Sequence, residues 1–380
     1  MSSEVHVTDT RNSADRFRSF SSADFLLPEG KEENWRFTPM ESLKEVLSSS
    51  AVFSHPSEEV EGVDITVVSS GDDRIGKAGA PDDILGAIAW EKAQSRNLLK
   101  ITSDQCEDTF VRVDLEKGLY AHHLCVDVQE RASGTVVMTY GGDATLANTV
   151  EILVGEAAEL TIVSIHNGKP DMKMMSSHRI KAAKNAVVRY VCITLDGGFV
   201  RVNTAVEFEG SGADVTLLGA YITNEHQHHE HRLFVNHQEP DCTSLVTYKG
   251  ALQGDNAHAV WVGDVLIGSQ ATQTKTYELN RNLVLSEGPR VDSIPNLEIE
   301  TGKIQGAGHA SATGRFDDEM LFYLQSRGLT EENARKLVVR GFFAEMIEHI
   351  GVPAVQEKLM GIIEEKLNLH AENNEVIGGE

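Results

Sequence analysis

Four histidines fall within seven positions in the segment EHQHHEH (225–231), and a fifth, His237, follows six residues later. Neutral imidazoles bind zinc or iron, and the spacing of His226 and His228 would point both in one direction. A cupin-type metal barrel uses such a pair, but its downstream glutamate and second histidine motif cannot be placed. In a strand, His231 and His237 would lie about 20 Å apart. The segment therefore favours a solvated, partly stacked polar ladder over a stable metal site.

The four cysteines are far apart and form no CxxC pair, which argues against a disulfide framework and a structural zinc site. Cys125 and Cys192 fall in apolar strands, where buried and inert thiols are expected. Cys242 follows Pro240 and Asp241 at the start of a strand, where we expect exposure. It is a weak candidate for a thiol ligand or a sulfur acceptor. This cysteine usage is typical of the reducing cytoplasm.

Two further segments look like sites but have simpler explanations. GDDRIGKA (71–78) matches most of a phosphate-binding loop. Ala78 stands where a hydroxyl should hold magnesium, and two aspartates would repel the phosphates, so we expect a surface turn without bound nucleotide. The acidic run at 317–319 sits where a helix begins and is expected to cap it. Because the sequence has no Gly-x-Ser-x-Gly elbow and no HExxH pair, hydrolase chemistry has no anchor.

A single histidine, His309, stands within the small-residue segment GAGHASATG (306–314). No bulky neighbour hides it, and small residues let another backbone approach closely. A lone histidine is commonly structural, yet this setting suits a ligand offered across an interface. We expect the segment to follow the last strand and to precede a helical region.

The composition restricts the partners of the chain. Its 380 residues carry a formal net charge of −24, which would repel both nucleic acid and an anionic membrane surface. No apolar run reaches the roughly 18 residues of a membrane span. The N-terminal stretch lacks the apolar segment of a secretion signal, so we predict a cytoplasmic protein without nucleic-acid or membrane partners.

The elements that must position these residues form three zones. Residues 61–305 contain short runs rich in Val, Ile, Thr and Tyr, in which a small residue followed by an alternating strand recurs every 24 to 30 residues or so. A repeat of two short strands predicts a parallel β-helix, or solenoid, and the competing interpretation is a large sandwich or barrel. Residues 1–60 are expected to form an N-terminal helical region.

Residues 306–380 are expected to form a C-terminal helical subdomain. Its first helix covers FDDEMLFYLQSRG. The second starts at Thr330, and we expect Gly341 to loosen or break it. Its apolar stripe is predicted at Leu337, Val338, Phe342, Met346 and Ile350. A last helix is expected over 353–369.

Several segments together resemble the SufB/SufD family of the SUF iron-sulfur cluster assembly system, and the SufD branch in particular. ENWRFTPMESL near the N-terminus is similar to the family's Trp-Arg-x-Thr motif, and QHHEHRLFVNHQEPDCTS to a stretch with Gln-His and Pro-x-Cys-x-Ser. The densest similarity includes NRNLVLS and PNLEIE and continues through GAGHASATG. It spans about residues 225–350.

The resemblance implies a right-handed parallel β-helix between helical ends, and a non-catalytic scaffold rather than an enzyme. It implies that the chain pairs with a SufB paralogue through the β-helix and docks a SufC ATPase on the C-terminal helical subdomain. A nascent iron-sulfur cluster is the implied cargo, bound transiently and shared with the partner. The family's ligand histidine falls on His309. Many relatives have a cysteine where this chain has Ala307, so His309 is the one iron ligand expected here, with Cys242 a weak candidate.

Absences distinguish the two branches of this family. SufB-like chains are longer and carry Cys-Glu-His-Glu where this chain has Ala-Gly-His-Ala. We therefore expect the supporting paralogue, with a SufB-like primary scaffold as the alternative. A β-helix enzyme acting on polysaccharide is a more distant alternative, because the clustered acids and bases it would need along one face are not found.

Overall fold

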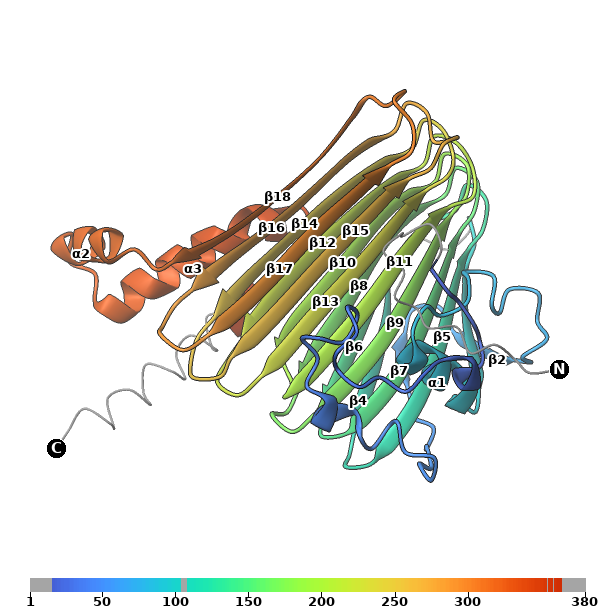
Figure 1. Cartoon of the computed structure of the whole chain (residues 1–380), viewed down its shortest axis with the longest axis horizontal. Coiled ribbons are helices and arrows are strands. Elements are labelled where there is room, and N and C mark those ends of the chain that lie inside the picture. Colours follow the sequence, from blue (N-terminus) through green and yellow to red (C-terminus); the bar gives the residue numbers. More distant parts are fainter. Residues whose placement is uncertain (1–15, 104–107, 354, 358, 364–380) are drawn as a thin grey trace.

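The computed structural model describes residues 16–103 and 108–363, except 354 and 358. Its strands alternate between two sheets of nine, so that the chain winds as a parallel β-solenoid of about 8 turns (Figure 1). One sheet contains β1 (Glu59–Glu61), β4 (Thr109–Leu115), β6 (Ser133–Gly142), β8 (Glu159–Gly168), β10 (Val187–Asp196), β12 (Asp214–Thr223), β14 (Thr243–Leu252), β16 (Lys275–Val284) and β18 (Gly306–Arg315). The other contains β2 (Ile65–Val68), β3 (Arg96–Ile101), β5 (Leu119–Val128), β7 (Thr145–Val154), β9 (Lys173–Ala182), β11 (Phe199–Phe208), β13 (His228–His237), β15 (His258–Ile267) and β17 (Arg290–Ile299). The predicted solenoid is confirmed, and the sandwich or barrel is not the fold.

The repeat noted in the sequence arises because equivalent residues of successive turns pair in register. Val188 of β10, for example, pairs with Leu160 of β8 and with Val215 of β12. These three side chains point between the sheets and belong to one continuous core. Because neighbouring turns cover each other's apolar faces, the strands form a common core that no single turn could bury.

A column of small residues occupies one corner of the solenoid. The turns that lead from one sheet to the other place a residue with positive φ there, such as Arg131, Ala157, Asn185 and Asp241. The next residue is small and buried in each of these turns: Ala132, Ala158, Ala186, Ala213 and Cys242 form the column. A larger side chain would have to fit into this tight inner corner. This column explains the recurrent small residue ahead of each strand.

The N-terminal part of the chain covers one outer face of the solenoid. In the region 1–60, which was expected to be helical, the structure has the short helices η2 (Ser22–Asp24) and η3 (Met40–Leu43). The α-helix of this region is α1 (Ile84–Lys92), which the sequence analysis missed, and it lies inside the span assigned to the β-helix. Its apolar residues join an outer hydrophobic cluster with Trp35 and Leu43 over β5, β7 and β9.

The C-terminal helices lie against and beyond the other outer face (Figure 1). Helix α2 (Asp318–Ser326) begins with Asp317 as its cap, as predicted. Helix α3 (Glu331–Glu348) passes through Gly341 without a break, which corrects the expected interruption. Met346 and Ile350 are buried as predicted, whereas Val338 and Phe342 are only partly buried and Leu337 is exposed. Val339, Phe343 and Ile347 complete the buried stripe. The part of the expected last helix beyond residue 363 lies outside the described residues.

The segment 306–315 is a strand, β18, and not the start of the helical subdomain. It pairs in register with β16 and forms the last strand of its sheet, so the solenoid ends after residue 315 and not at 305. Glycine and alanine have low strand propensity, and pairing with β16 overrides it here. Among the helices of the described ranges, none is long and apolar enough to span a membrane.

Candidate functional site

His309 lies on the final strand, where the solenoid presents an open end. The imidazole is exposed, and it makes no hydrogen bond or ion pair with the described residues. Strand β18 pairs on one side with β16, and its other edge has no strand partner in the described chain. The same is true of β17 in the opposite sheet. The exposure expected for His309 is therefore found, although it stands on a strand and not on a loop.

The side chain of His309 projects toward the interior side of β18. Two residues away on either side, Ala307 packs against the solenoid core and Ser311 donates to Ser293 of β17 at 2.8 Å. Because alternate residues of a strand share a face, His309 shares the face of these two residues. It is exposed because no further turn covers the last one. A histidine at this position can reach both solvent and a second protein.

Glu278 of β16 is the neighbour of His309 in the sheet, since the two residues are register partners. Its side chain is buried, with 1% of the residue exposed, and both carboxyl oxygens lack a hydrogen-bond partner among the described residues. Burial raises the pKa of Glu278 to about 8, with a smaller contribution from Asp264. The sequence analysis did not identify this residue, since its position within KTYELNRN carries no motif.

Small residues flank His309 in β18, and the neighbouring strands β16 and β17 each expose one large apolar side chain. Tyr277 and Ile299 are each 45% exposed at this end. A Cβ added at Gly306 or Gly314 would meet no atom within 4 Å, so another backbone could approach β18 closely. The two unpaired strand edges and this open surface are suited to contact with another protein.

The histidine-rich segment is buried, which corrects the expectation of a solvated ladder. His229, His231 and His237 of β13 point into the solenoid and are at most 1% exposed. His231 shares a hydrogen bond of 2.9 Å with the Thr194 hydroxyl group, and His237 shares one of 2.9 Å with the Ser244 hydroxyl group. Burial lowers the pKa of His231 and of His237 to about 3. These imidazoles are neutral core residues that satisfy neighbouring hydroxyl groups.

His226 and His228, the pair whose spacing would have suited a metal ion, do not share a site. His226 lies exposed in a turn with a φ of 61°, whereas His228 is buried and stacks on Phe199 at 5.5 Å. Across the described ranges, no group of three or more His, Cys, Asp or Glu side chains is placed to hold a metal ion. The aromatic stacking part of the expectation does appear, because His228 also contacts His258.

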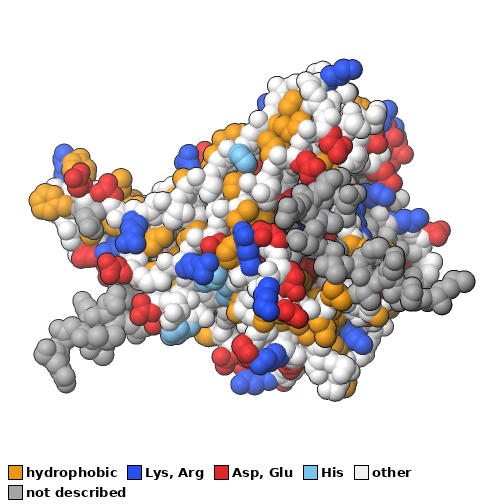
Figure 2. All heavy atoms as spheres, viewed as in Figure 1, with side chains coloured by type: hydrophobic (Ala, Val, Ile, Leu, Met, Phe, Trp, Pro, Cys, Tyr) orange, Lys and Arg blue, Asp and Glu red, His pale blue; other side chains and the backbone are white. Residues whose placement is uncertain are grey.

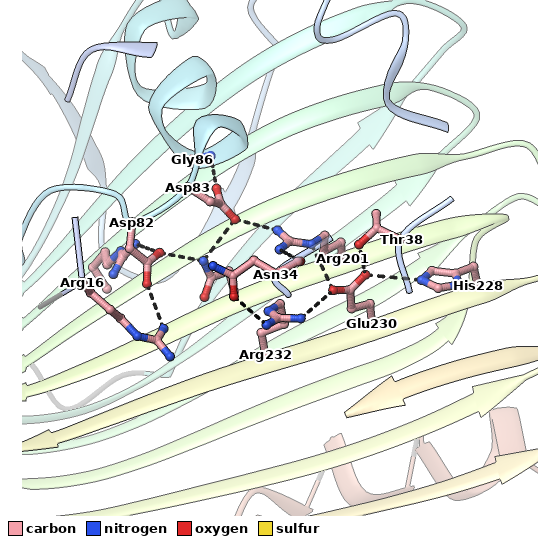
Figure 3. A network of polar contacts seen from close by, with 12 residues as sticks. Arg16, Asn34, Thr38, Asp82, Asp83, Gly86, Arg201, His228, Glu230 and Arg232 are labelled. Atoms are coloured by element: carbon pink, nitrogen blue, oxygen red, sulfur yellow. Dashed lines mark hydrogen bonds and ion pairs between the residues drawn. The ribbon is translucent and has the colours of Figure 1, made fainter. Parts of the chain in front are cut away.

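The acid within the histidine segment, Glu230, has a structural role. Thr38 donates to it at 2.8 Å, and Arg201 and Arg232 donate at 3.2 and 3.3 Å (Figure 3). Burial alone would raise the pKa of Glu230, but Arg201 and a hydrogen bond from His228 hold it well below its usual value. The network ties the N-terminal segment to the outer face of β11 and β13.

The same network continues to helix α1 and borders a cavity of about 550 Å³. Arg201 donates to Asp83 at 2.6 Å, and Asp83 in turn accepts from the Gly86 N–H at the helix start (Figure 3). Asp82 is paired with Arg16 and Arg179. The arginines and carboxylates of this network pair with one another. The network therefore stabilises the fold, and its charged groups are already engaged.

The loop that resembled a phosphate-binding loop holds a carboxylate of the chain itself. Glu151 of β7 accepts hydrogen bonds from the backbone N–H of Gly76 at 2.8 Å and of Ala78 at 3.3 Å. His123 contacts the same carboxyl group at 2.9 Å. The backbone donors that a phosphate would need are thus already engaged.

Cys242 is buried, which corrects its expected exposure. It is 0% exposed within the small-residue column, and its thiol donates to the Gly210 carbonyl at 3.4 Å. Burial raises the pKa of this thiol. Cys125 and Cys192 are also buried, as expected. Cys106 lies outside the described residues. A role for Cys242 as a sulfur acceptor would require the corner of the solenoid to open.

Helix α2 exposes several large apolar side chains to solvent. Phe322 is 73% exposed, Tyr323 55% and Met320 47%, and Figure 2 shows hydrophobic side chains gathered at this projecting tip. Leu337, which lies in the next helix of the sequence, α3, is 51% exposed. Helix α3 itself is anchored, since Lys249 of β14 donates to the Phe342 carbonyl at 3.0 Å and pairs with Glu345. Helix α3 is thus held against the solenoid, whereas the apolar side chains of α2, which precedes it, are exposed.

Comparison with known proteins extends these observations. Residues 111–342 match the family model described as SUF system FeS cluster assembly, SufBD core domain. An iron-sulfur cluster assembly SufBD family protein of Mycobacterium leprae is 46% identical over 367 residues, which cover 93% of this chain and 94% of that protein. The iron-sulfur cluster assembly protein SufD of Escherichia coli is 23% identical over 382 residues, 90% of this chain and 89% of its own. The protein of that name from Bacillus subtilis is 24% identical over 264 residues, 68% of this chain and 60% of its own.

Proposed function

Because this chain belongs to the SufBD family of the SUF iron-sulfur cluster assembly system, we propose that it is a scaffold subunit with no reaction of its own. The observation that carries the proposal is the exposed His309 on β18, a strand whose outer edge has no strand partner in the described chain. Iron-sulfur clusters are held mainly by cysteine thiolates, and one imidazole would bind the cluster weakly enough to release it. The cluster is cargo in this proposal, and the assembly takes place in the cytoplasm.

The open end of the solenoid supports pairing with a SufB paralogue. Within the described ranges, strands β17 and β18 each have one edge without a strand partner, and a second solenoid could continue both sheets by adding its own strands. Glycine and alanine on β18 permit a close approach, and Tyr277 and Ile299 supply apolar area. In such a complex His309 would face the junction, where the partner can provide the remaining ligands of the cluster.

The C-terminal helices support docking of a SufC ATPase. Helix α2 exposes Met320, Phe322 and Tyr323 on one projecting element, and large exposed aromatic side chains are typical of protein interfaces. Helix α3 fixes this element to the solenoid through its buried stripe. A nucleotide-driven movement of the ATPase could therefore be transmitted to the solenoid and to its open end.

The proposal is tested by anaerobic co-expression of the chain with candidate SufB and SufC partners. The wild-type chain should purify as a complex that carries iron and sulfide. His309→Ala should leave the complex intact and lower its cluster content several-fold. A matched control is His226→Asn, which removes another exposed imidazole at a turn where asparagine tolerates the positive φ.

Three outcomes would contradict the proposal. The first is a chain that forms no complex with either partner, and the second is an unchanged cluster content in the His309→Ala complex. The third is turnover of a substrate, such as a polyuronate, by the isolated chain, because that would favour the polysaccharide-active alternative.

A further inference from the structure

Glu278 differs from the other buried acids of the solenoid in having no partner. Glu230 receives hydrogen bonds from Thr38 and two arginines, and Glu151 is held by two backbone N–H groups. Both oxygens of Glu278, by contrast, lack a hydrogen-bond partner within the described part of the chain. An unpaired buried carboxyl group destabilises the folded state, even when it is kept neutral. A residue retained only for packing would not need this group.

The carboxyl group of Glu278 lies beneath the open end. A Cβ added at Gly263 of β15, in the opposite sheet, would come within 2.7 Å of the Glu278 Oε1 atom and within 2.4 Å of the Trp261 ring. The absence of a side chain at Gly263 therefore makes room for the acid between the sheets. The Trp261 indole N–H at the same place also lacks a partner within the described part of the chain.

His309 occupies the layer directly above this acid. The register pairs Glu278 with His309, and paired residues of neighbouring parallel strands point to the same side with a separation of about 4.8 Å. Pro295 of β17 stands next to Gly263 in the opposite sheet, since these two residues are also register partners. The last two turns thus place a buried carboxyl group next to an exposed imidazole.

We propose that Glu278 and His309 together form an iron-binding site, in which a carboxylate oxygen and an imidazole nitrogen bind one ferrous ion at the open end. The two side chains are close enough in the sheet to reach one ion after rotation of the Glu278 side chain. Oxygen and nitrogen ligands suit ferrous iron. Two ligands leave the remaining coordination positions to sulfide and to a partner protein.

This inference rests on the proposed function and adds a second residue to it. A bound ferrous ion would supply the positively charged partner that the Glu278 carboxyl group lacks among the described residues. A site with two protein ligands binds iron weakly, which suits transfer of the cargo to a partner. Glu278 would act before the cluster is complete, when iron alone must be captured.

The test is an anaerobic titration of the full-length chain with ferrous iron alone, in which calorimetry measures the dissociation constant. Four proteins are compared: the wild type, Glu278→Gln, His309→Ala and the control Glu287→Gln, which removes an exposed carboxylate in the turn between β16 and β17. We expect the wild type and the control to bind equally. Each of the two site variants should bind about 10- to 100-fold more weakly.

A second variant protects the test against a folding defect. Gly263→Ala keeps the carboxyl group but displaces it, because its Cβ would meet Glu278 Oε1. It should also weaken iron binding. Circular dichroism and urea unfolding of each variant verify that the fold is retained.

The results separate this inference from the proposed function. Wild-type affinity in Glu278→Gln, with weaker binding in His309→Ala, would overturn the role of Glu278 and leave the scaffold proposal standing. Absence of iron binding by the wild type up to millimolar iron would also overturn the two-residue site. Failure of the chain to form a complex with SUF partners would instead contradict the scaffold proposal, whatever the iron titration shows.

Discussion

The histidines of this chain serve different purposes according to their surroundings. His178, His231 and His237 lie inside the solenoid, where each hydrogen-bonds a hydroxyl group and burial lowers its pKa to about 3. They are neutral, and burial inside the solenoid keeps them away from an ion in solvent. His309 is exposed and without a partner in the described chain. Exposure and free coordination capacity, not the density of histidines, single out the candidate ligand.

Replacement of Cys242 should have little effect on function. Because Cys242 continues a column of alanines, Cys242→Ala should fit the corner and cost no more than about 2 kcal/mol of stability. Urea unfolding measures this, and cluster content of the co-purified complex should stay unchanged. In the native chain the thiol should resist alkylation, since burial raises its pKa. Rapid labelling, or loss of clusters in a stable Cys242→Ala protein, would restore Cys242 to the site.

Removal of the Glu230 carboxylate should be strongly destabilising. Glu230→Ala leaves Arg232 without its buried counter-charge and Arg201 with Asp83 alone, and breaking a buried pair costs about 3–5 kcal/mol. The exposed Glu225 is the matched control, and Glu225→Ala should change the unfolding free energy by less than about 0.5 kcal/mol. Similar unfolding midpoints for the two variants would show that the network does not hold the N-terminal segment.

Sequence reasoning located His309 but not its surroundings. A short segment of glycine and alanine around one histidine is visible in the chain, whereas the neighbour Glu278 becomes relevant only through the register of β16 and β18. Burial of His231 and Cys242 likewise depends on the turns stacked above and below them. Polar residues in a strand look exposed when the strand is considered alone. Residue types therefore predicted the candidate ligand, and only the fold could show which polar residues are covered.

At the scale of elements, the solenoid turns followed from their pattern, but the ends did not. Alternation and a recurrent small residue predicted the strands, because every turn buries the same face. Strand β18 has no such pattern and exists because β16 provides a partner. Helix α3 tolerates Gly341 because Val339 and Phe343 on either side are buried against the solenoid. Tertiary contacts decide the structure wherever local preferences are weak.

Helix α2 should be required for binding of the ATPase partner. Phe322→Asp places a charge in the centre of the exposed apolar surface, where it cannot be buried without cost. Co-purification of SufC should be lost, while the unfolding midpoint should change little because the residue is exposed. Val52→Asp is the control, since Val52 is 83% exposed elsewhere. Retention of SufC by Phe322→Asp would exclude this surface as the docking site.

At the scale of the whole molecule, the two ends of the solenoid are unlike each other. At the first end β1 and β2 pair antiparallel to β4 and β3, and so depart from the parallel stacking. At the last end β17 and β18 keep the parallel stacking, and their outer edges have no strand partner among the residues that the structure describes. The end that carries His309 is therefore the one at which added strands could continue the parallel stacking.

The stability of the chain should fall on mild acidification. Burial lowers the pKa of His178, His231 and His237 to about 3, whereas in the unfolded chain they titrate near 6.5. Below pH 6.5 the unfolded chain therefore binds protons that the folded chain excludes, and stability is lost progressively toward pH 3. The expected loss is about 1 kcal/mol per histidine for each pH unit.

Urea unfolding at pH 7, 6 and 5 measures this dependence. Glu278 acts with the opposite sign, because its raised pKa of about 8 adds stability that is complete below pH 4.5 and disappears as the pH rises through 8. The three histidines outweigh this one acid, so the midpoint should decrease from pH 7 to pH 5. A constant or rising midpoint would contradict the neutral, buried state of the histidines.

Above all, we propose that the His309 imidazole binds a cluster that is shared with a paralogous subunit. Pulsed EPR of the reduced cluster in the co-purified complex tests it most directly, because a bound imidazole gives a nitrogen hyperfine coupling. The account predicts this coupling in the wild-type complex and its loss in an intact His309→Ala complex. A nitrogen coupling that persists unchanged in His309→Ala would contradict the account.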